Sequence, residues 1–170
     1  MSGTLRLYLL RHAKSGHAAG VADIDRPLNE RGRHEAAAVA QLMRSRGDDP
    51  ARVLCSSSRR TRETLAPLVA MLEGTRSIEI TRRIYEASAG DLLGLIGEQD
   101  GDVPSLLLIG HNPGLEDLAR ILAGTGEPAA MAALHAGLPP ATLMELSFAG
   151  RSWSEIAPGS GRLEAFLPPS

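Results

Sequence analysis

The stretch LRLYLLRHAKS, residues 5–15, is the part of the chain from which the fold can be inferred most directly. Its first six residues form a short, mostly apolar run, which is typical of a buried β-strand. The run ends at Arg11 and His12 without a small-residue cleavage site, and it is far shorter than the roughly 18 to 20 apolar residues of a membrane helix. We therefore expect a strand here, rather than a signal peptide or a membrane anchor, in a soluble cytoplasmic protein.

Short apolar runs alternate with segments of helical spacing along most of the remaining chain. The further predicted strands are residues 52–55, 77–80, 105–109 and 142–148, and the predicted helices are residues 29–46, 60–72, 89–96 and 114–123. Repeated strand-helix units of this kind favour right-handed crossovers and parallel pairing. The sequence therefore predicts the α/β class, as a three-layer α/β/α sandwich with a mixed, mostly parallel sheet. We expect a surface loop with at most a short helix over residues 124–140, and a tail, residues 158–170, that is irregular at its end.

The overall composition limits the possible classes of function. The chain has 170 residues, of which 43% are hydrophobic, so we expect a single domain over residues 1–170. The net charge of -2 provides no global positive field, and nucleic acid and membranes are not expected partners. Cys55 is the only cysteine, which excludes an internal disulfide, and no spacing of metal ligands appears. We expect no metal and no cofactor, and an activity that survives a chelator.

Basic and polar side chains follow three of the predicted strands. Ligands bind beyond the carboxyl ends of the strands in an open α/β sheet. The first strand ends at Arg11 and His12, the second runs into residues 56–60 (SSSRR), and the strand 105–109 runs into His111. Each is followed by a turn or a helix start, where free backbone N–H groups and the helix dipole favour an anion. We expect these three segments to converge around a phosphate group.

The motifs at these positions resemble those of the histidine phosphatase superfamily, also called the phosphoglycerate mutase-like superfamily. LRHAKS (residues 10–15) is similar to its Arg-His-Gly signature, and RPLNERG (26–32) to its Arg-Pro-Leu-Thr-x-x-Gly segment. SSSRRTRET (56–64) resembles Ser-Pro-x-x-Arg-Ala-x-Gln-Thr, and GHNP (110–113) resembles the second-histidine motif. The departures are Ala13 for glycine, Ser57 for proline, Thr61 for alanine and Glu63 for glutamine. The resemblance spans roughly residues 5–150. In its size and its lack of a large cap insertion, the chain is most similar to the short SixA-like branch, whose members are phosphohistidine phosphatases.

This resemblance implies a catalytic role for each of four residues. His12 would be the nucleophile that briefly carries the phosphoryl group, with its tautomer fixed by a backbone carbonyl near residue 13 or by a nearby side chain. Arg11 and Arg60 would bind phosphate oxygens with their fork geometry, and His111, protonated beside the dianion, would complete the pocket. Alanine at position 13 would cause strain if that position required a positive φ.

Three other residues have both a functional and a structural interpretation. Glu86 lies where the resemblance places a general acid, and the alternative is a surface glutamate. Ser15 could donate to a phosphate oxygen, as the matching family serine does, or could serve as a turn residue. Asn112 could bind phosphate through its backbone N–H, or could cap the following helix with Pro113 in the first turn. We expect His34 and His135 to be surface groups, and His17, which follows the signature closely, either to contact substrate or, as the favoured interpretation, to be a surface group as well.

The expected substrate is a phosphorylated protein carrying phosphohistidine, or a small phosphorylated metabolite. The resemblance favours a SixA-like phosphohistidine phosphatase. A small-molecule phosphomonoesterase of the same superfamily and a non-catalytic phosphate-binding module remain alternatives. A mutase would need longer inserts that close over the site, and this chain has little spare length.

Overall fold

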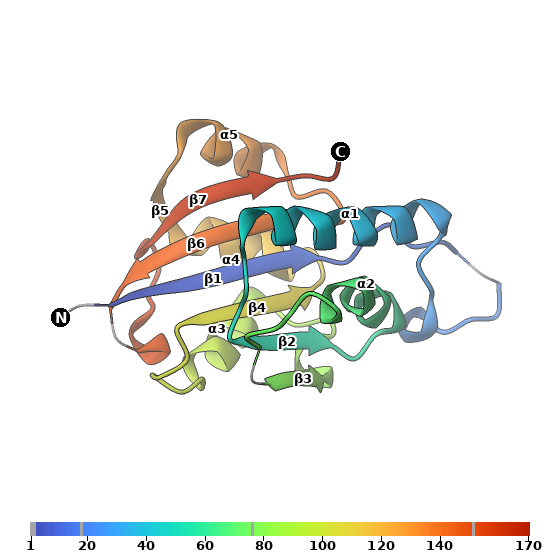
Figure 1. Ribbon diagram of the computed structural model, residues 1–170, viewed down its shortest axis with the longest axis horizontal. Helices are drawn as coiled ribbons and strands as arrows, with labels where there is room; N and C mark the ends of the chain where they lie inside the picture. Colours follow the sequence, from blue (N-terminus) through green and yellow to red (C-terminus); the bar gives the residue numbers. More distant parts are fainter. Residues whose placement is uncertain (1–2, 18, 76, 151) are drawn as a thin grey trace.

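The structure, a computed structural model, describes residues 3–17, 19–75, 77–150 and 152–170, in which a seven-stranded sheet lies between two layers of helices (Figure 1). The strands are β1 (Thr4–Arg11), β2 (Arg52–Ser56), β3 (Ser77–Thr81), β4 (Ser105–Gly110), β5 (Ala123–Gly126), β6 (Leu143–Ala149) and β7 (Gly161–Leu167). The helices are α1 (Glu30–Arg46), α2 (Arg59–Val69), α3 (Ala89–Gly97), α4 (Gly114–Leu122) and α5 (Pro128–Ala136), with three short 3-10 turns, η1 (Asp23–Asp25), η2 (Arg82–Ile84) and η3 (Trp153–Glu155). Among the described residues, no helix is long and apolar enough to cross a membrane.

The strand order places the carboxyl ends of β1, β2 and β4, which the predicted site residues follow, at one edge of the sheet. The order is β3-β2-β4-β1-β6-β7-β5. β4 pairs in parallel with both β1 and β2, β3 pairs in parallel with β2, and β5 with β7, whereas β6 is antiparallel to β1 and β7. The register places Arg11 opposite Gly110, so β1 and β4 end side by side (Figure 1). The prediction of a mixed, mostly parallel sheet is confirmed.

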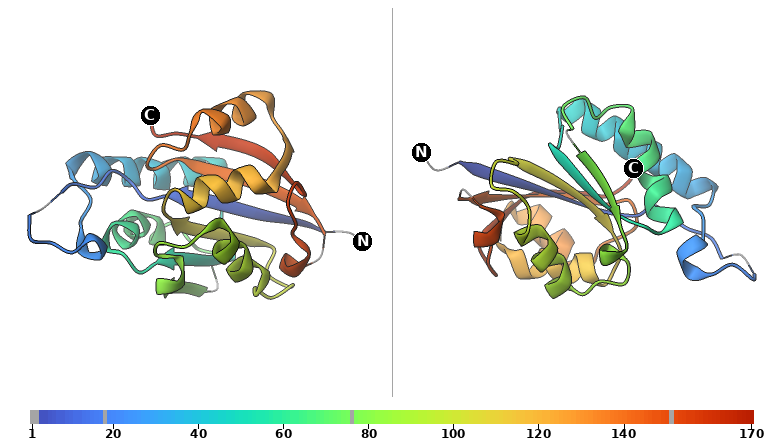
Figure 2. Two further views of the ribbon diagram at one scale, coloured as in Figure 1. Left: turned by 180° about the vertical axis from the view of Figure 1, so that it is seen from behind. Right: turned by 90° about the horizontal axis from the view of Figure 1, so that it is seen from below.

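The two faces of the sheet are covered by different helices (Figure 2). Successive side chains of a strand point to opposite faces. Tyr8 and Leu10 of β1 pack in one buried cluster with residues of α1 and α2. Leu7 and Leu9 belong to a second cluster, with residues of α3, α4 and α5. This arrangement confirms the predicted α/β/α layers.

Two segments differ from the sequence-based prediction. Residues 124–140 contain most of strand β5, which was not predicted, and the nine-residue helix α5, for which the prediction had allowed a short helix. In the tail, residues 161–167 form strand β7, and only residues 168–170 are irregular at the end. β7 pairs with β6 on one side and β5 on the other. Long-range pairing therefore outweighs the Gly and Pro content, on which the prediction relied.

The first turn of α1 packs tightly against the loop that follows His12. Asn29 caps the helix by accepting a 2.8 Å hydrogen bond from the Gly32 N–H. A Cβ added at Gly32 would lie 1.9 Å from the Lys14 carbonyl oxygen. Because that oxygen belongs to the backbone, we expect Gly32→Ala to lower the free energy of unfolding by about 1–3 kcal/mol, measured by chemical denaturation.

A glycine in open space is the matched control for this substitution. Gly94 lies inside α3, and a Cβ added there meets nothing within 4 Å. Alanine is a better helix former than glycine, so Gly94→Ala is expected to raise the free energy of unfolding by up to about 1 kcal/mol. Equal destabilisation by the two substitutions would contradict the importance of the contact between Gly32 and Lys14.

Candidate active site

The two histidines predicted to face the substrate lie next to each other at the ends of neighbouring strands. His12 directly follows β1, and its backbone N–H donates a 3.1 Å hydrogen bond to the carbonyl of Gly110, the last residue of β4. His111 comes next after β4, and the centroids of the two imidazole rings are 5.3 Å apart. The parallel pairing of β1 with β4 therefore explains why residues almost 100 positions apart share one site.

His12 is held in one tautomer by the backbone. Its Nδ1 lies 2.8 Å from the Ala13 carbonyl oxygen, which can only accept, so Nδ1 carries the proton and Nε2 keeps its lone pair. Burial lowers the pKa of His12 to about 4, and the positive charges of Arg60 and Arg11 act in the same direction, against the hydrogen bond to Ala13. His12 is therefore neutral at pH 7, as a nucleophile must be. Ala13 has no positive φ, so alanine fits this position without strain.

Arg11 and Arg60 bring unpaired donors to the site. Arg60, the second residue of α2, is only 6% exposed, and Arg11 is half-buried at the end of β1. The Nε atom of each is buried and finds no hydrogen-bond partner among the described residues. A buried donor without a partner is costly, and an anion between the two guanidinium groups would satisfy both.

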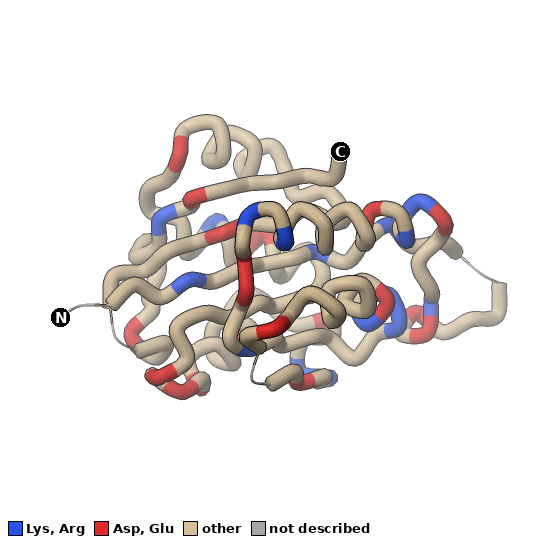
Figure 3. Tube along the Cα trace, viewed as in Figure 1, with Lys and Arg blue, Asp and Glu red and all other residues tan. Residues whose placement is uncertain are grey.

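These groups line a polar hollow of about 290 Å³, which we call the phosphate hollow. Its lining consists of Arg11, His12, Lys14, Ser15, His17, Arg26, Arg60, His111, Asn112 and Pro140. Lys14 and His17 are exposed and form part of the lining, which agrees with the alternative that His17 could contact substrate. Figure 3 shows Lys and Arg interspersed with Asp and Glu along the chain trace. In the part of the chain that the structure describes, the lining of the hollow has, in contrast, four basic side chains, Arg11, Lys14, Arg26 and Arg60, and no carboxylate.

His111 makes one hydrogen bond with each ring nitrogen. Nε2 lies 2.7 Å from the Ser56 hydroxyl, and Nδ1 lies 3.4 Å from Nη2 of Arg60. Burial is the main cause that lowers the pKa of His111 to about 3, and the neighbouring His12 and the positive charge of Arg60 act in the same direction, against the attraction of Asp23. His111 is therefore neutral when no anion is bound. The expected protonated form requires the negative charge of the substrate.

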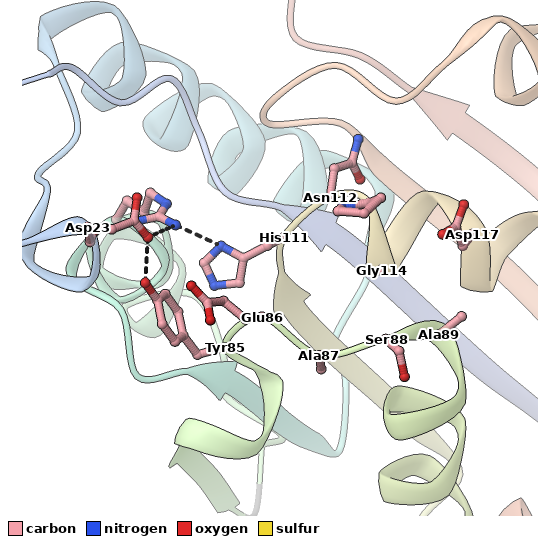
Figure 4. A pocket seen from close by; sticks show the side chains of 12 residues that line it. Asp23, Tyr85, Glu86, Ala87, Ser88, Ala89, His111, Asn112, Gly114 and Asp117 are labelled. Atoms are coloured by element: carbon pink, nitrogen blue, oxygen red, sulfur yellow. Dashed lines mark hydrogen bonds and ion pairs between the residues drawn. The ribbon is translucent and has the colours of Figure 1, made fainter.

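Asp23, which the sequence did not single out, anchors Arg60 (Figure 4). The Asp23 carbonyl accepts a 2.7 Å hydrogen bond from Nη1 of Arg60, and its carboxylate accepts hydrogen bonds from Nη2 of Arg60 and from the Tyr85 hydroxyl. Arg26 also donates to this carboxylate from Nε, at 3.0 Å. The Tyr85 hydrogen bond and the two guanidinium groups hold the pKa of the Asp23 carboxyl well below its usual range. One charged side chain thus joins η1, α2 and the segment after η2.

Arg26 is a second residue that the sequence analysis did not assign to the site. It lines the phosphate hollow, and its Nη1 donates to the Ser15 hydroxyl at 3.0 Å and to the Gly16 carbonyl at 3.1 Å. Its position in the RPLNERG segment, which resembles a family motif, was the available signal, but no role at the site was assigned to Arg26 from it. Ser15 accepts from Arg26 and so keeps its own hydroxyl proton available for a phosphate oxygen.

Asn112 lines the phosphate hollow but does not cap the following helix. α4 begins at Gly114 with Pro113 in the N-cap position, and no side chain caps it. The Asn112 amide donates instead to the Leu138 carbonyl at 3.0 Å, and Arg11 donates to the same oxygen at 2.7 Å. The predicted N-cap role was therefore wrong, because the side chain is turned toward Leu138.

Glu86 lies in a second cavity, of about 470 Å³, which adjoins the phosphate hollow at Arg60, His111 and Asn112. Glu86 is exposed, and its backbone has a positive φ of 56°. Figure 4 shows its carboxylate beside His111 and Tyr85. Glu86 therefore lines the cavity next to the phosphate hollow, whereas Arg11 and His12 line the hollow itself. Among the described residues, no group of three or more His, Cys, Asp or Glu side chains is arranged to hold a metal ion.

Comparisons with known proteins show which family this chain belongs to. Residues 7–114 match the family model of the histidine phosphatase superfamily, branch 1. An uncharacterised protein of Mycobacterium tuberculosis is 35% identical over 162 residues, which is 94% of this chain and 99% of that protein. An Agrobacterium tumefaciens structure, provisionally assigned as the phosphohistidine phosphatase SixA, is 35% identical with a TM-score of 0.80, over 97% of this chain and 98% of the other.

A provisionally assigned SixA from Nakamurella is 28% identical with a TM-score of 0.81, and the match covers 98% of this chain and 97% of that one. The family model covers more than half of the present chain, and it includes the segments that carry His12, Arg60 and His111. This protein therefore belongs to branch 1 of the histidine phosphatase superfamily, as a SixA-like member.

Proposed function

We propose that this protein hydrolyses phosphohistidine in a phosphorylated protein, through a covalent phosphoryl intermediate on His12. The observation that carries the proposal is a neutral His12 of fixed tautomer beside two guanidinium groups with unpaired Nε donors. Membership of the family implies a hydrolase with a histidine nucleophile. The assignments of the relatives from Agrobacterium and Nakamurella support phosphohistidine as the substrate.

In the first step, Nε2 of His12 attacks the phosphorus atom and the bond from phosphorus to the substrate's imidazole nitrogen breaks. The Nδ1–H of His12 keeps its hydrogen bond to the Ala13 carbonyl throughout. Arg11 and Arg60 stabilise the charge on the equatorial oxygens, which is the main requirement of phosphoryl transfer. The leaving imidazole takes up one proton.

In the second step, a water molecule attacks the phosphorylated His12 and releases orthophosphate. The bond from phosphorus to Nε2 breaks and its electron pair returns to Nε2, which regenerates neutral His12 with its proton still on Nδ1. The proton lost by the water stays on the orthophosphate or passes to solvent. Glu86 is our proposed general acid for the first step, because its carboxylate lies beside His111 in the adjoining cavity. An imidazole leaves with less help than an alkoxide, so Glu86 should matter more for phosphate esters than for phosphohistidine.

A substrate panel tests the proposal. Phosphohistidine peptides are compared with phosphoserine, phosphotyrosine, sugar phosphates and nucleotides, and the His12→Asn variant serves as the blank. We expect the highest kcat/KM for phosphohistidine. A sugar phosphate or nucleotide with the highest value would make the protein a small-molecule phosphomonoesterase, and binding without turnover would make it a phosphate-binding module.

The acid limb of the pH profile should lie unusually low for a histidine nucleophile. Protonation removes the lone pair of His12, so activity is lost as pH falls through its pKa, which burial lowers to about 4. The kcat/KM for p-nitrophenyl phosphate is expressed per substrate monoanion, which already carries the proton that His111 takes up on binding. This value should therefore stay level from pH 7 to about 5 and fall near about 4. A corrected limb close to about 6.5, the ordinary histidine pKa, would contradict this environment for His12.

A further inference from the structure

Ser56, the last residue of β2, lies directly behind His111. It is fully buried, and its Oγ is 2.7 Å from Nε2 of His111. Neither the motif that contains Ser56 nor the mechanism above gives this hydroxyl a role. His111 is nevertheless neutral in the free protein and is expected to be protonated beside the bound dianion. Which of its ring nitrogens carries the proton therefore decides which one can donate to the substrate.

The direction of the hydrogen bond between Ser56 and His111 follows from Arg60. A guanidinium group has no acceptor, so the 3.4 Å contact between Nη2 of Arg60 and Nδ1 of His111 requires a lone pair on Nδ1. The single proton of neutral His111 must then be on Nε2, where it is donated to the Ser56 oxygen. The opposite tautomer would direct an N–H at the Arg60 donor and would leave Nε2 without a proton to donate.

We propose that Ser56 is a positioning residue that holds His111 in the Nε2–H tautomer, so that Nδ1, the nitrogen facing Arg60, is the only atom that can take up a proton. When a phosphate dianion binds between the guanidinium groups, a phosphoryl oxygen takes the place of Arg60 Nη2 opposite Nδ1 of His111, and the new Nδ1–H donates to that oxygen. The hydrogen bond from Nε2 to Ser56 persists and stabilises the imidazolium ion. This inference rests on the proposed function for its consequence in catalysis, but the tautomer itself does not depend on it.

The surroundings of His111 explain why a bound dianion is needed for this proton uptake. The charged and titratable groups near its ring are His12 and Arg11 from β1 and the loop after it, Arg60 from α2, Asp23 from η1, and Tyr85 and Glu86 from the segment after η2. Asp23 is already bound to three donors, two of them guanidinium groups. The free site is therefore electropositive, and the dianion supplies the missing negative charge.

Ser56→Ala leaves the Nε2–H of His111 buried without an acceptor. We expect kcat to fall about 10-fold, because an unsatisfied buried donor disfavours the productive tautomer. KM should change less than kcat, since Arg11 and Arg60 are untouched. Ser56→Thr keeps the hydroxyl and should restore kcat, and Thr142→Val is the control, because it removes a buried hydroxyl that has no partner among the described residues.

Nitrogen-15 NMR of the histidine side chains tests the tautomer directly. The chain has five histidines, and the His111 signals are assigned by their loss in His111→Asn. At pH 7 without phosphate, we expect a protonated Nε2 and an unprotonated Nδ1 in the wild type, protonation of both nitrogens on saturation with inorganic phosphate, and a mixture of tautomers in Ser56→Ala.

Two results would overturn the proposal. One is a wild-type His111 with its proton on Nδ1, a measurement that does not require any variant to fold. The other is a folded Ser56→Ala protein with unchanged kcat and unchanged His111 signals. A wild type with the expected tautomer but without turnover on any substrate would instead count against the proposed function alone.

Discussion

The His12→Asn variant is expected to lose kcat by on the order of 10⁴-fold or more, because no other group at the site can accept the phosphoryl group. Asparagine is smaller than histidine, and its amide can still donate to the Ala13 carbonyl that holds Nδ1 in the wild type. The fold should therefore survive, with a melting temperature within a few degrees of the wild type. Steady-state turnover of an aryl phosphate and of a phosphohistidine peptide measures the loss.

His34→Asn is the matched control, because His34 is exposed on α1 and does not line the site. It should have wild-type activity. A brief incubation of wild-type protein with labelled substrate, followed by denaturation, should trap an acid-labile, base-stable phosphoramidate on His12. Retention of activity in His12→Asn, or a label on another residue, would show that His12 is not the nucleophile.

The position of the site could be predicted because it depends on local sequence and sheet direction. Apolar runs that end in Arg11-His12, in residues 56–60 and in His111 are visible in the sequence, and the carboxyl ends of parallel strands meet at one edge. In the structure, the parallel register of β1 and β4 aligns Arg11 with Gly110, so His12 and His111 follow neighbouring strand ends. Charge and position were therefore enough to infer which groups converge.

The contacts that hold these groups in place could not be predicted in the same way. Asp23 lies in the short 3-10 turn η1, which has no strand-end or helix-cap signal in the sequence, and its contacts with Arg60 and Tyr85 join segments 37 and 62 residues away. The direction of the Asn112 side chain likewise depends on Leu138, 26 residues further along. Such contacts are set by the packing of loops against each other, which sequence periodicity does not record.

The difference between local sequence signals and long-range contacts also explains the errors in the predicted fold. β5 consists of Ala-Gly-Thr-Gly, which has little intrinsic preference for a strand, and it forms because β7 pairs with it. β7 is in turn paired with β6. Strands whose stability comes from distant partners were missed, whereas β1 and β4, with five or more buried residues each, were predicted within one residue at either end.

Arg60→Ala is expected to lower kcat by about 10²- to 10³-fold, the usual effect of removing one group that stabilises charge in the transition state. Arg60 is the group on which the site depends at three points: it donates to Asp23 with both Nη atoms, it contacts Nδ1 of His111, and its Nε has no partner before an anion binds. Arg60→Lys should recover only a small part of the activity, because a single ammonium group cannot contact Asp23, His111 and the phosphate at the same time.

The neighbouring arginine of the same helix turn shows whether position or charge is responsible. The Arg59 side chain is 51% exposed and bonds to Glu63 on the surface of α2. Arg59→Ala removes the same charge and should leave kcat within about twofold of the wild type, since exposed ion pairs contribute little. If Arg59→Ala and Arg60→Ala lost activity equally, or if Arg60→Lys were fully active, general positive charge rather than the fork geometry of Arg60 would account for phosphate binding.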